Sequence, residues 1–220
     1  RKFVISELNS SEILRIIMTH PSMFLKMFYK RRVNNFYLDS ADRKNYYEHV
    51  GGNAQRLKIR IRWYGKTLGF IEKPFLEIKI KNGELGRKIS FPLVGFALDE
   101  NFCFDDLKQV FKESNLPDNL KQWLLLLFPC LLNSYEREYF SSADKKLRLT
   151  LDTNVIFYKI KFLDNFFREK IEIKNTKVLE LKYSQGDEII ASNAAQDLPF
   201  RLSANSKYIS GVDLLEDMGY

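Results

Sequence analysis

The chain has 220 residues, of which 45% are hydrophobic and 14% aromatic, and it carries a net charge of +7. This size suffices for one domain with a buried core, and the aromatic content favours a β-rich fold. Two cysteines exclude a disulfide framework, two isolated histidines exclude a zinc site, and no apolar run reaches the roughly 18 residues of a membrane-spanning helix. The positive charge favours an anionic partner, such as a phosphate compound, nucleic acid or a membrane surface.

The first elements are predicted from capping signals and periodicity. Residues 1–5 have the pattern of a short strand. Asn9 and Glu12 have the spacing of a capping box, so a helix is expected to begin there and to continue through Thr19, before a proline. Residues 22–31 carry Met and Phe at helical spacing and are predicted to form a second short helix.

A strand is predicted over 33–38, followed by a short helix or irregular loop over 42–50. The next stretch, 56–64, alternates basic and apolar residues at every step. Successive strand side chains point to opposite faces, so the cations of this strand share one face. These cations are Arg56, Lys58, Arg60 and Arg62. On a strand that stood alone, this pattern would indicate a face open to solvent.

The rest of the chain contains further strands and helices. Asn82-Gly83 is a hairpin signal between two predicted strands, 75–81 and 85–91, and 66–74 is expected to be a loop. Helices are predicted from Asp105 or Asp106 to about 112 and from 117 to 128, and the apolar run 123–132 is interpreted as a buried helix. The later predicted elements are strands at 134–141, 146–152, 155–162, 171–174 and 177–183 and a short helix within 206–220.

The alternation of charged and apolar residues recurs in the later strands. The polar positions are Glu77, Lys79 and Lys81; Tyr135, Arg137 and Tyr139; Arg148, Thr150 and Asp152; and Glu180 and Lys182. Such strands predict an α+β fold in which an antiparallel barrel or strongly curved sheet has helices on its apolar outside, in one domain over 1–220. The charged side then faces solvent or a wet tunnel. Mostly positive charges with a few carboxylates suit a polyanion and a divalent metal ion.

Two groups of these residues are open to a simpler interpretation. Glu77 and Lys81 are equally compatible with a solvated pair on the sheet surface. Glu136 and Glu138 alternate with Arg137, so their side chains are expected on the outside of the sheet.

Several stretches match the motifs of a known family in the same order. They are Val-Asn-Asn-Phe-Tyr-Leu-Asp-Ser at 33–40, Leu-Lys-Ile-Arg-Ile-Arg-Trp-Tyr-Gly at 57–65, Phe-Leu-Glu-Ile-Lys at 75–79, Ser-Tyr-Glu-Arg-Glu-Tyr-Phe at 134–140, Leu-Arg-Leu-Thr-Leu-Asp-Thr at 147–153, Leu-Glu-Leu-Lys-Tyr at 179–183 and Ser-Lys-Tyr at 206–208. Together they resemble the VTC (vacuolar transporter chaperone) domain, which is similar to the triphosphate tunnel metalloenzymes, or CYTH-like proteins. The resemblance covers nearly the whole chain.

This resemblance implies a closed antiparallel β-barrel tunnel of about eight strands and a polyphosphate polymerase activity. The enzyme would move the ATP γ-phosphate onto a polyphosphate chain with the help of Mn²⁺ or Mg²⁺. By motif match, Glu180 is the implied metal ligand. The implied catalytic residues are Arg60, Arg62, Lys79, Arg137, Arg148 and Lys182. The implied substrate-binding residues are Lys2, Arg56, Lys58, Lys81 and Lys207. Lys2 matches the end of a Glu-x-Glu-x-Lys pattern whose acidic residues are absent here.

Two other functions use the same charges. A triphosphatase or cyclase would give water or a ribose hydroxyl the role of nucleophile, and a non-catalytic module would bind polyphosphate without turnover. Nucleic acid is not expected as a partner, because aromatic stacking residues are not interleaved with the basic strands. With no signal peptide visible, a cytoplasmic protein without membrane contact of its own is expected.

Overall fold

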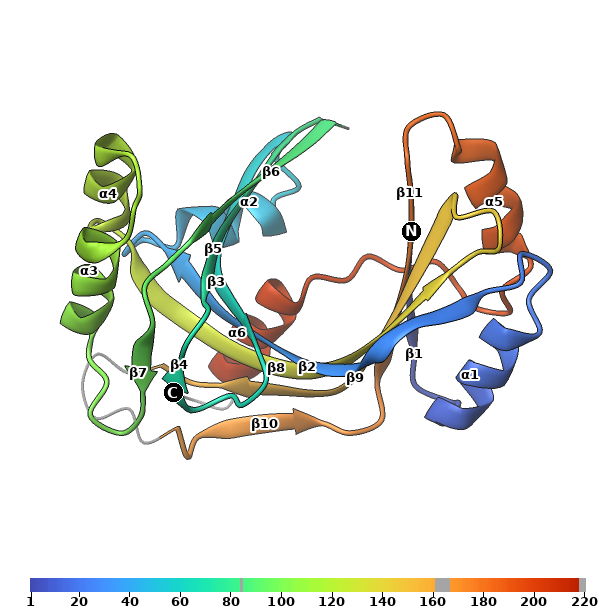
Figure 1. The fold of residues 1–220 in the computed structure, drawn as a ribbon, viewed down its shortest axis with the longest axis horizontal. Coiled ribbons are helices and arrows are strands. Elements are labelled where there is room, and N and C mark those ends of the chain that lie inside the picture. The colour runs from blue at the N-terminus through green and yellow to red at the C-terminus, as the bar shows by residue number, and fades with distance from the viewer. Residues whose placement is uncertain (84, 161–166, 218–220) are drawn as a thin grey trace. The chain divides into compact units, whose positions relative to one another are not determined.

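The computed structural model describes residues 1–83, 85–160 and 167–217 and shows an α+β protein built mainly from antiparallel strands (Figure 1). In chain order the elements are β1 (Lys2–Ile5), α1 (Ser10–Met18), β2 (Leu25–Asp39), α2 (Lys44–Val50), β3 (Gln55–Tyr64), β4 (Gly69–Ile71), β5 (Phe75–Asn82), β6 (Leu85–Pro92), β7 (Phe96–Leu98), α3 (Phe104–Glu113), α4 (Asp118–Leu124), β8 (Phe128–Ser141), β9 (Leu147–Tyr158), β10 (Lys170–Ile173), β11 (Lys177–Tyr183), α5 (Glu188–Gln196) and α6 (Lys207–Asp217).

The main sheet has nine strands in the order β1-β11-β9-β8-β2-β3-β5-β6, with β10 paired to β9, and a small second sheet pairs β4 with β7. Among the described residues, the strand order ends at β1 and β6 and does not include a pairing between them. The closed tunnel that the family resemblance implies therefore stays a proposal. Residue contacts divide the chain into two compact units. Unit 1 comprises Arg1–Arg32, Tyr135–Val155 and Glu172–Ser206, and unit 2 comprises Val33–Ser134, Ile156–Ile171 and Lys207–Tyr220. That residues 1–220 form a single domain stays a prediction.

In unit 1, the leucines of two paired strands form the apolar face. Leu149 pairs with Leu181 and Leu151 with Leu179 between β9 and β11, and all of them are buried. They pack in one core with Phe3 of β1, residues of α1 and alanines of α5. The predicted capping box begins α1, because the Asn9 side chain accepts from the Glu12 amide and the Glu12 carboxylate accepts from the Asn9 amide. The predicted first strand and first helix are therefore confirmed.

In unit 2, the apolar face of β3 and β5 packs on a helical layer. Ile59, Ile61 and Trp63 of β3 are buried in one core with residues of α3, α4, β4 and β7. The predicted strand 56–64 and the hairpin β5–β6 are confirmed. The register pairs Asn82 with Leu85, so the turn lies one residue later than predicted, with Gly83 at a positive φ of 58°. Glycine adopts this backbone conformation without strain.

The predicted helix over 22–31 is wrong, because β2 begins at Leu25. The lysines at 26 and 30 form ion pairs with Glu138 and Glu136 of β8, at 2.6 and 3.1 Å. Pairing with a neighbouring strand overrides the local helical spacing of the apolar residues, which a short window cannot show. Glu138 is 5% exposed and pairs with Lys26, and its position on the outside of the sheet stays a prediction.

The apolar run 123–132 is not a continuous helix. Helix α4 ends at Leu124, and β8 begins at Phe128, because a short apolar run fits a buried strand as well as a helix. The strands predicted at 146–152 and 155–162 form one continuous strand, β9, in which Asn154 has a positive φ of 52°. Residues 161–162 and 218–220 of the predicted elements lie outside the described residues.

Some elements were missed or placed differently at their ends. Strand β4 lies in the stretch expected to be a loop, and neither β7 nor α5 was predicted. Helix α3 is capped by Cys103, whose amide donates to the Asp106 carboxylate at 2.7 Å, so Asp106 belongs to the first turn and is not the cap itself. Strands β10 and β11 and helix α6 agree with the prediction within the described residues.

Candidate phosphate-binding and metal-binding sites

The polar face of β3, β5 and β6 in unit 2 carries one carboxylate among many cations. Register pairs Arg62 with Phe75, Arg60 with Glu77, Lys58 with Lys79 and Arg56 with Lys81, and β5 in turn pairs Lys79 with Lys88 of β6. Paired residues of antiparallel strands point to the same face. The cations that share this face are Arg56, Lys58, Arg60, Arg62, Lys79, Lys81 and Lys88.

Glu77 is the centre of this group. Its carboxylate accepts from Arg60 Nε and Nη2 at 2.9 and 2.6 Å and from Lys88 Nζ at 2.9 Å, and Arg62 Nη1 lies 3.6 Å away. The side chain is only 9% exposed. Burial acts to raise the pKa of Glu77, but Arg60, Arg62 and Lys88 outweigh it and lower the pKa to about 2. Glu77 is therefore a permanent anion that orients the two arginines, and it is not a solvated partner of Lys81.

Lys58, Lys79 and Lys88 lie opposite one another in a row across β3, β5 and β6. Arg56 and Lys81 form a second like-charged pair in the next row on the same face. Like charges directly opposite each other destabilise a sheet by mutual repulsion. A bound polyanion would remove this repulsion, so the rows are suited to phosphate groups.

Arg62 is held by two buried asparagines. Arg62 Nε donates to Asn35 Oδ1 at 2.8 Å, and Asn35 Nδ2 donates to Asn133 Oδ1 at 2.8 Å. Both asparagines are fully buried. The Asn133 Nδ2 atom has no hydrogen-bond partner among the described residues. This hydrogen-bond network fixes the orientation of the Arg62 guanidinium.

In unit 1, Arg137 is paired with Asp152 on the neighbouring strand. Arg137 Nε and Nη2 donate to the two carboxylate oxygens at 2.5 and 2.7 Å, and both residues are buried. Burial acts to lower the pKa of Arg137, but Tyr135 and Asp152 outweigh it and the pKa is raised. The guanidinium also lies over the Tyr135 ring, 5.1 Å from its centre. Two donors of Arg137 are therefore engaged by Asp152 in this structure.

Glu180 lies in a second polar group of unit 1. Register places Lys2 and Thr150 on either side of Glu180 and pairs Lys182 with Arg148 in the next row. Lys182 Nζ lies 3.4 Å from a Glu180 oxygen. Burial acts to raise the pKa of Glu180, but Lys182, Lys2 and Arg137 outweigh it and the pKa is lowered. Glu180 is thus ionised at neutral pH, as a metal ligand must be.

The residues around Glu180 fit a magnesium-type ion bound largely through its substrate. Within the described ranges, no group of three His, Cys, Asp or Glu residues gathers in metal-binding geometry. Thr150 Oγ1, next to Glu180 in register, is buried and has no partner among the described residues. Mg²⁺ and similar ions commonly take one or two carboxylates and complete their coordination with water and phosphate oxygens. Glu180 with the Thr150 hydroxyl matches that pattern.

Lys207 opens α6, and the packing of that helix in unit 2 fixes its position. Tyr208 donates from its hydroxyl to the buried Asp39 carboxylate at 2.5 Å, and Tyr46 of α2 bonds to Asp213. A Cβ on Gly211 would come within 2.6 Å of Leu131 and Phe157, so only glycine permits this close approach. Helix α6 is therefore held tightly enough to place Lys207 reproducibly.

The structure brings the predicted residues together in two groups. Arg56, Lys58, Arg60, Arg62, Lys79 and Lys81 meet in unit 2, and Lys2, Arg137, Arg148, Glu180 and Lys182 share strand pairs in unit 1. Lys2 Nζ also donates to the Asn205 carbonyl at 2.6 Å. Sequence reasoning assigned no site role to Glu77, Lys88, Asn35 or Asp152. Only Glu77 and Asp152 gave any signal, since both lie in the alternating patterns.

The sequence profile of the VTC domain matches residues 1–216. The chain belongs to the VTC domain family. This VTC domain is structurally similar to several solved proteins at low sequence identity, which shows a shared fold. No curated protein sequence matches it.

Three solved structures illustrate the shared fold. A Pyrococcus horikoshii OT3 protein is 14% identical with a TM-score of 0.52, and the match covers 99% of each chain. A Vibrio parahaemolyticus protein described as a candidate adenylate cyclase is 12% identical, with a TM-score of 0.50 over 96% of each chain. A Hippeastrum protein, described as a candidate adenylyl cyclase with a dominant triphosphatase activity, is 12% identical with a TM-score of 0.51, over 96% of this VTC domain and 94% of that chain.

The helices of this VTC domain are short. Within the described residues, none is both long enough and apolar enough to cross a membrane.

Proposed function

We propose that this VTC domain is a divalent-metal-dependent polyphosphate polymerase that transfers the ATP γ-phosphate onto a growing polyphosphate chain within a basic tunnel. The observation that carries the proposal is the row of lysines 58, 79 and 88 beside Arg60 and Arg62, with Glu77 as the carboxylate that this face shares. Glu77 offsets only part of the positive charge on this face, so an anion with several charges would be favoured there. Membership of the VTC family supports phosphate as that anion.

Phosphoryl transfer needs positioned cations more than covalent chemistry from the protein. Arg60 and Arg62, oriented by Glu77 and Asn35, would present their guanidinium forks to phosphate oxygens. Lys79 and Lys58 would add point charges in the next row along the strands. Arg148 and Lys182, paired in unit 1, would do the same there. The attacking group would be the terminal phosphate of the chain, so no Ser, Cys or His nucleophile is required.

Glu180 would hold the metal ion, Mn²⁺ or Mg²⁺, with the Thr150 hydroxyl beside it. When bound, such an ion would help to neutralise negative charge on the phosphate groups. Lys182 and Lys2 keep the Glu180 carboxylate ionised in the absence of the metal. Arg137, locked by Asp152, would contribute its remaining donors and its charge to this region.

A triphosphatase is the second candidate, because the Hippeastrum structure, which shares the fold, is described as having a dominant triphosphatase activity. It would use the same cations and metal ligand, with water in place of the terminal phosphate as the nucleophile. Because the nucleophiles differ, the two functions give different products from ATP.

The test is to incubate the protein with ATP and Mn²⁺, to separate the products on a gel stained for polyphosphate, and to assay free phosphate in parallel. A ladder of long chains with ADP release supports the polymerase. Free phosphate without chains supports the triphosphatase and contradicts the polymerase. Neither product, with ATP or polyphosphate still bound, contradicts both and indicates a binding module.

A matched pair of variants tests the assignment of Glu180 in the same assay. Glu180→Gln should abolish metal-dependent turnover and retain phosphate binding. Glu136→Gln, a change in the same unit at a carboxylate held by Lys30 and Arg32, should leave turnover unchanged. Full activity of Glu180→Gln would remove Glu180 from the metal site.

A further inference from the structure

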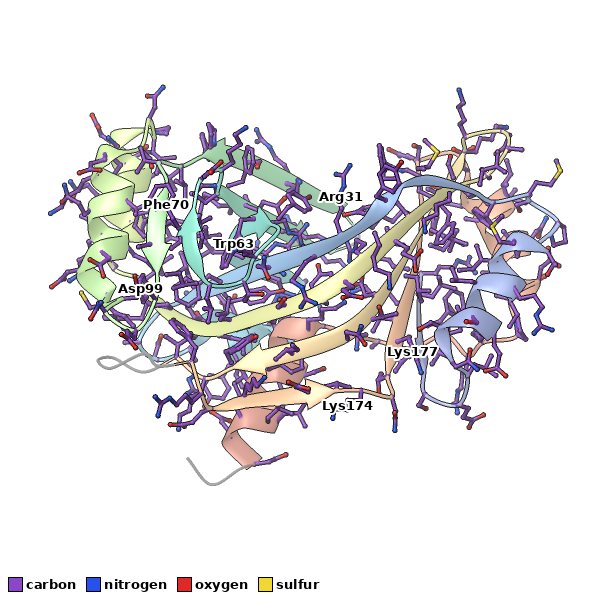
Figure 2. The ribbon with its side chains drawn as sticks, turned by 60° about the horizontal axis from the view of Figure 1, so that its bottom comes forward. Arg31, Trp63, Phe70, Asp99, Lys174 and Lys177 are labelled. Carbon is purple, nitrogen blue, oxygen red and sulfur yellow. The ribbon has the colours of Figure 1, made fainter. Side chains whose placement is uncertain are left out.

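Unit 2 contains a pocket of about 400 Å³ beside the end of β3, and none of the residues that line it was assigned a site role from the sequence. Aromatic residues make up half of its lining, and Figure 2 marks two of them, Trp63 and Phe70. The residues that line it are Trp63, Tyr64, Lys66, Phe70, Ile71, Glu72, Lys73 and Phe75. This volume falls within the range of small-molecule sites, which are typically apolar clefts with a few polar groups.

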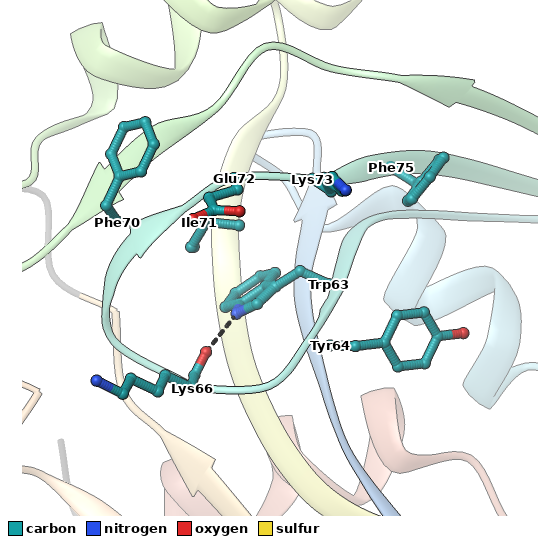
Figure 3. Close-up of a pocket in the computed structure, with 8 residues that line it drawn as sticks. All are labelled: Trp63, Tyr64, Lys66, Phe70, Ile71, Glu72, Lys73 and Phe75. Carbon is teal, nitrogen blue, oxygen red and sulfur yellow. Dashed lines mark hydrogen bonds between the residues drawn. The ribbon is translucent and has the colours of Figure 1, made fainter. Parts of the chain in front are cut away.

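The pocket is preformed by hydrogen bonds to the loop after β3. Trp63 Nε1 donates to the Lys66 carbonyl at 2.9 Å, which fixes the indole as part of the wall (Figure 3). The buried Asn34 donates from Nδ2 to the Gly65 carbonyl at 3.1 Å, and Thr67 donates its hydroxyl proton to Asn34 Oδ1 at 3.0 Å. A loop fixed in this way loses little freedom when a ligand binds.

Two aromatic rings of the pocket belong to the same sheet face as the cations. Phe75 pairs directly with Arg62, and Tyr64 follows Arg62 by two residues, so all three point to one side. Tyr64 is 48% exposed and Phe75 39% exposed, so their rings are accessible to a ligand. Tyr64, Arg62 and Arg60 are two residues apart on the same face of β3. Neighbouring members of this series are therefore about 7 Å apart along the strand.

We propose that this pocket binds the nucleobase and ribose of the nucleoside triphosphate substrate, while the phosphates extend onto Arg62 and Arg60. The inference rests on the proposed function and adds the binding subsite for the base. Tyr64 and Phe75 would stack on the base, since each nucleobase has a π-face on which aromatic side chains pack. Glu72 would accept a hydrogen bond from N–H groups at the base edge, and Lys73 lies where it can meet the ribose or first phosphate.

Continuity with the cation face favours a nucleotide over an apolar peptide side chain as the occupant. Phe75 lines the pocket and is the register partner of Arg62, so the pocket adjoins the end of the cation face. A ligand that is aromatic at one end and polyanionic at the other matches both halves. Two lysines, Lys66 and Lys73, and one carboxylate, Glu72, line the pocket, so its net charge is positive and also favours an anion.

The test is equilibrium binding by calorimetry with two ligands: β,γ-imido-ATP, which resists transfer, and inorganic tripolyphosphate, whose integrity is checked by phosphate assay. In Tyr64→Ala/Phe75→Ala, the Kd for the ATP analogue should rise about 5- to 150-fold, since base stacking contributes about 1–3 kcal/mol per base. The Kd for tripolyphosphate should stay unchanged. Tyr64→Leu/Phe75→Leu, which keeps apolar volume but removes the rings, should behave in the same way.

Tyr29→Ala is the matched control, because this tyrosine is 92% exposed and lies in unit 1, outside the pocket. It should change neither Kd. Equal weakening of both ligands in the double variants would show that the rings only support the strands, and would overturn the inference. Unchanged binding of the ATP analogue would also overturn it, while leaving the proposed function intact. Failure of the unaltered protein to bind either ligand would overturn the proposed function as well.

Discussion

Arg137 and Asp152 form a buried ion pair with two parallel hydrogen bonds, of 2.5 and 2.7 Å, between neighbouring strands of unit 1. The pair explains how an arginine that is 8% exposed remains charged. Removing one partner of such a pair leaves the other charge buried without compensation, and this typically costs about 3–5 kcal/mol. The pair therefore makes the fold of unit 1 depend on a side chain that sequence reasoning gave no role.

Asp152→Asn should lower the free energy of unfolding by about 3–5 kcal/mol, because it removes the charge opposite Arg137 but retains the shape. Urea unfolding followed by circular dichroism measures the loss. Asp105→Asn is the control, since Asp105 pairs with Lys108 at 2.8 Å on the exposed side of α3. Exposed pairs of this kind stabilise little, so its loss should be much smaller. Equal losses in the two variants would contradict the assignment.

Glu77 predicts a specific pH dependence of stability. Its pKa falls from 4.5 to about 2 on folding, because Arg60, Arg62 and Lys88 outweigh the effect of burial. A lowered acid pKa stabilises the folded state fully above the unfolded pKa, and the contribution is lost as pH falls towards the folded pKa. The unaltered protein should therefore exceed Glu77→Gln in stability above pH 4.5, and the difference should shrink towards about pH 2.

The measurement is the urea midpoint of both proteins across that pH range. Glu113→Gln, at an exposed carboxylate on α3, is the control and should show no comparable convergence with the unaltered protein. A difference between Glu77→Gln and the unaltered protein that stays constant down to about pH 2 would mean that packing, and not charge, accounts for the effect.

The sequence predicts those features of this site that depend on a single strand. It does not predict the features that depend on how the strands pair. Alternation over 56–64 correctly places Arg60 and Arg62 on one face and Ile59 and Ile61 in the core. The lysine row needs the pairing of β3, β5 and β6, which no single strand encodes. Glu77 has the same pattern whether it is solvated or buried among arginines, so its role emerges only when its neighbours are known.

The element predictions failed where tertiary pairing decided the outcome. Residues 25–32 have apolar residues at helical spacing, yet they form part of β2, which pairs with β8 in the main sheet. The apolar run at 123–132 similarly contains both the end of α4 and the start of β8. A buried strand and a buried helix present the same composition over so few residues.

Asn35 should act as a positioning residue for Arg62. Asn35→Ala removes the acceptor of Arg62 Nε and the donor to Asn133, and both asparagines are fully buried. Leaving such groups unpaired costs about 1–3 kcal/mol of stability. Tripolyphosphate binding should weaken as well, because the guanidinium loses its fixed orientation. Calorimetry and urea unfolding measure the two effects.

Asn101→Ala, at an exposed asparagine next to α3, is the control for this prediction and should change neither stability nor binding. Loss of stability in Asn35→Ala without any change in tripolyphosphate affinity would assign the Asn35–Asn133 network to folding alone. Arg62 would then be oriented by Glu77, whose carboxylate lies 3.6 Å away.

The row of Lys58, Lys79 and Lys88 predicts that removing a charge stabilises the protein in the absence of ligand. Lys79 lies between the other two, so Lys79→Gln relieves both repulsions. The free energy of unfolding should rise by about 0.2–1 kcal/mol at low salt, which is the typical magnitude for a cross-strand pair. The gain should vanish at about 1 M salt, where screening reduces interactions beyond about 3 Å.

Tripolyphosphate affinity of Lys79→Gln should fall at the same time, so stability and binding should change in opposite directions. Lys108→Gln removes a lysine that pairs with Asp105, and it should show no gain in stability. A loss of stability in Lys79→Gln at low salt would mean that the row is already neutralised within the folded chain, and the main support for a polyanion on this face would be lost.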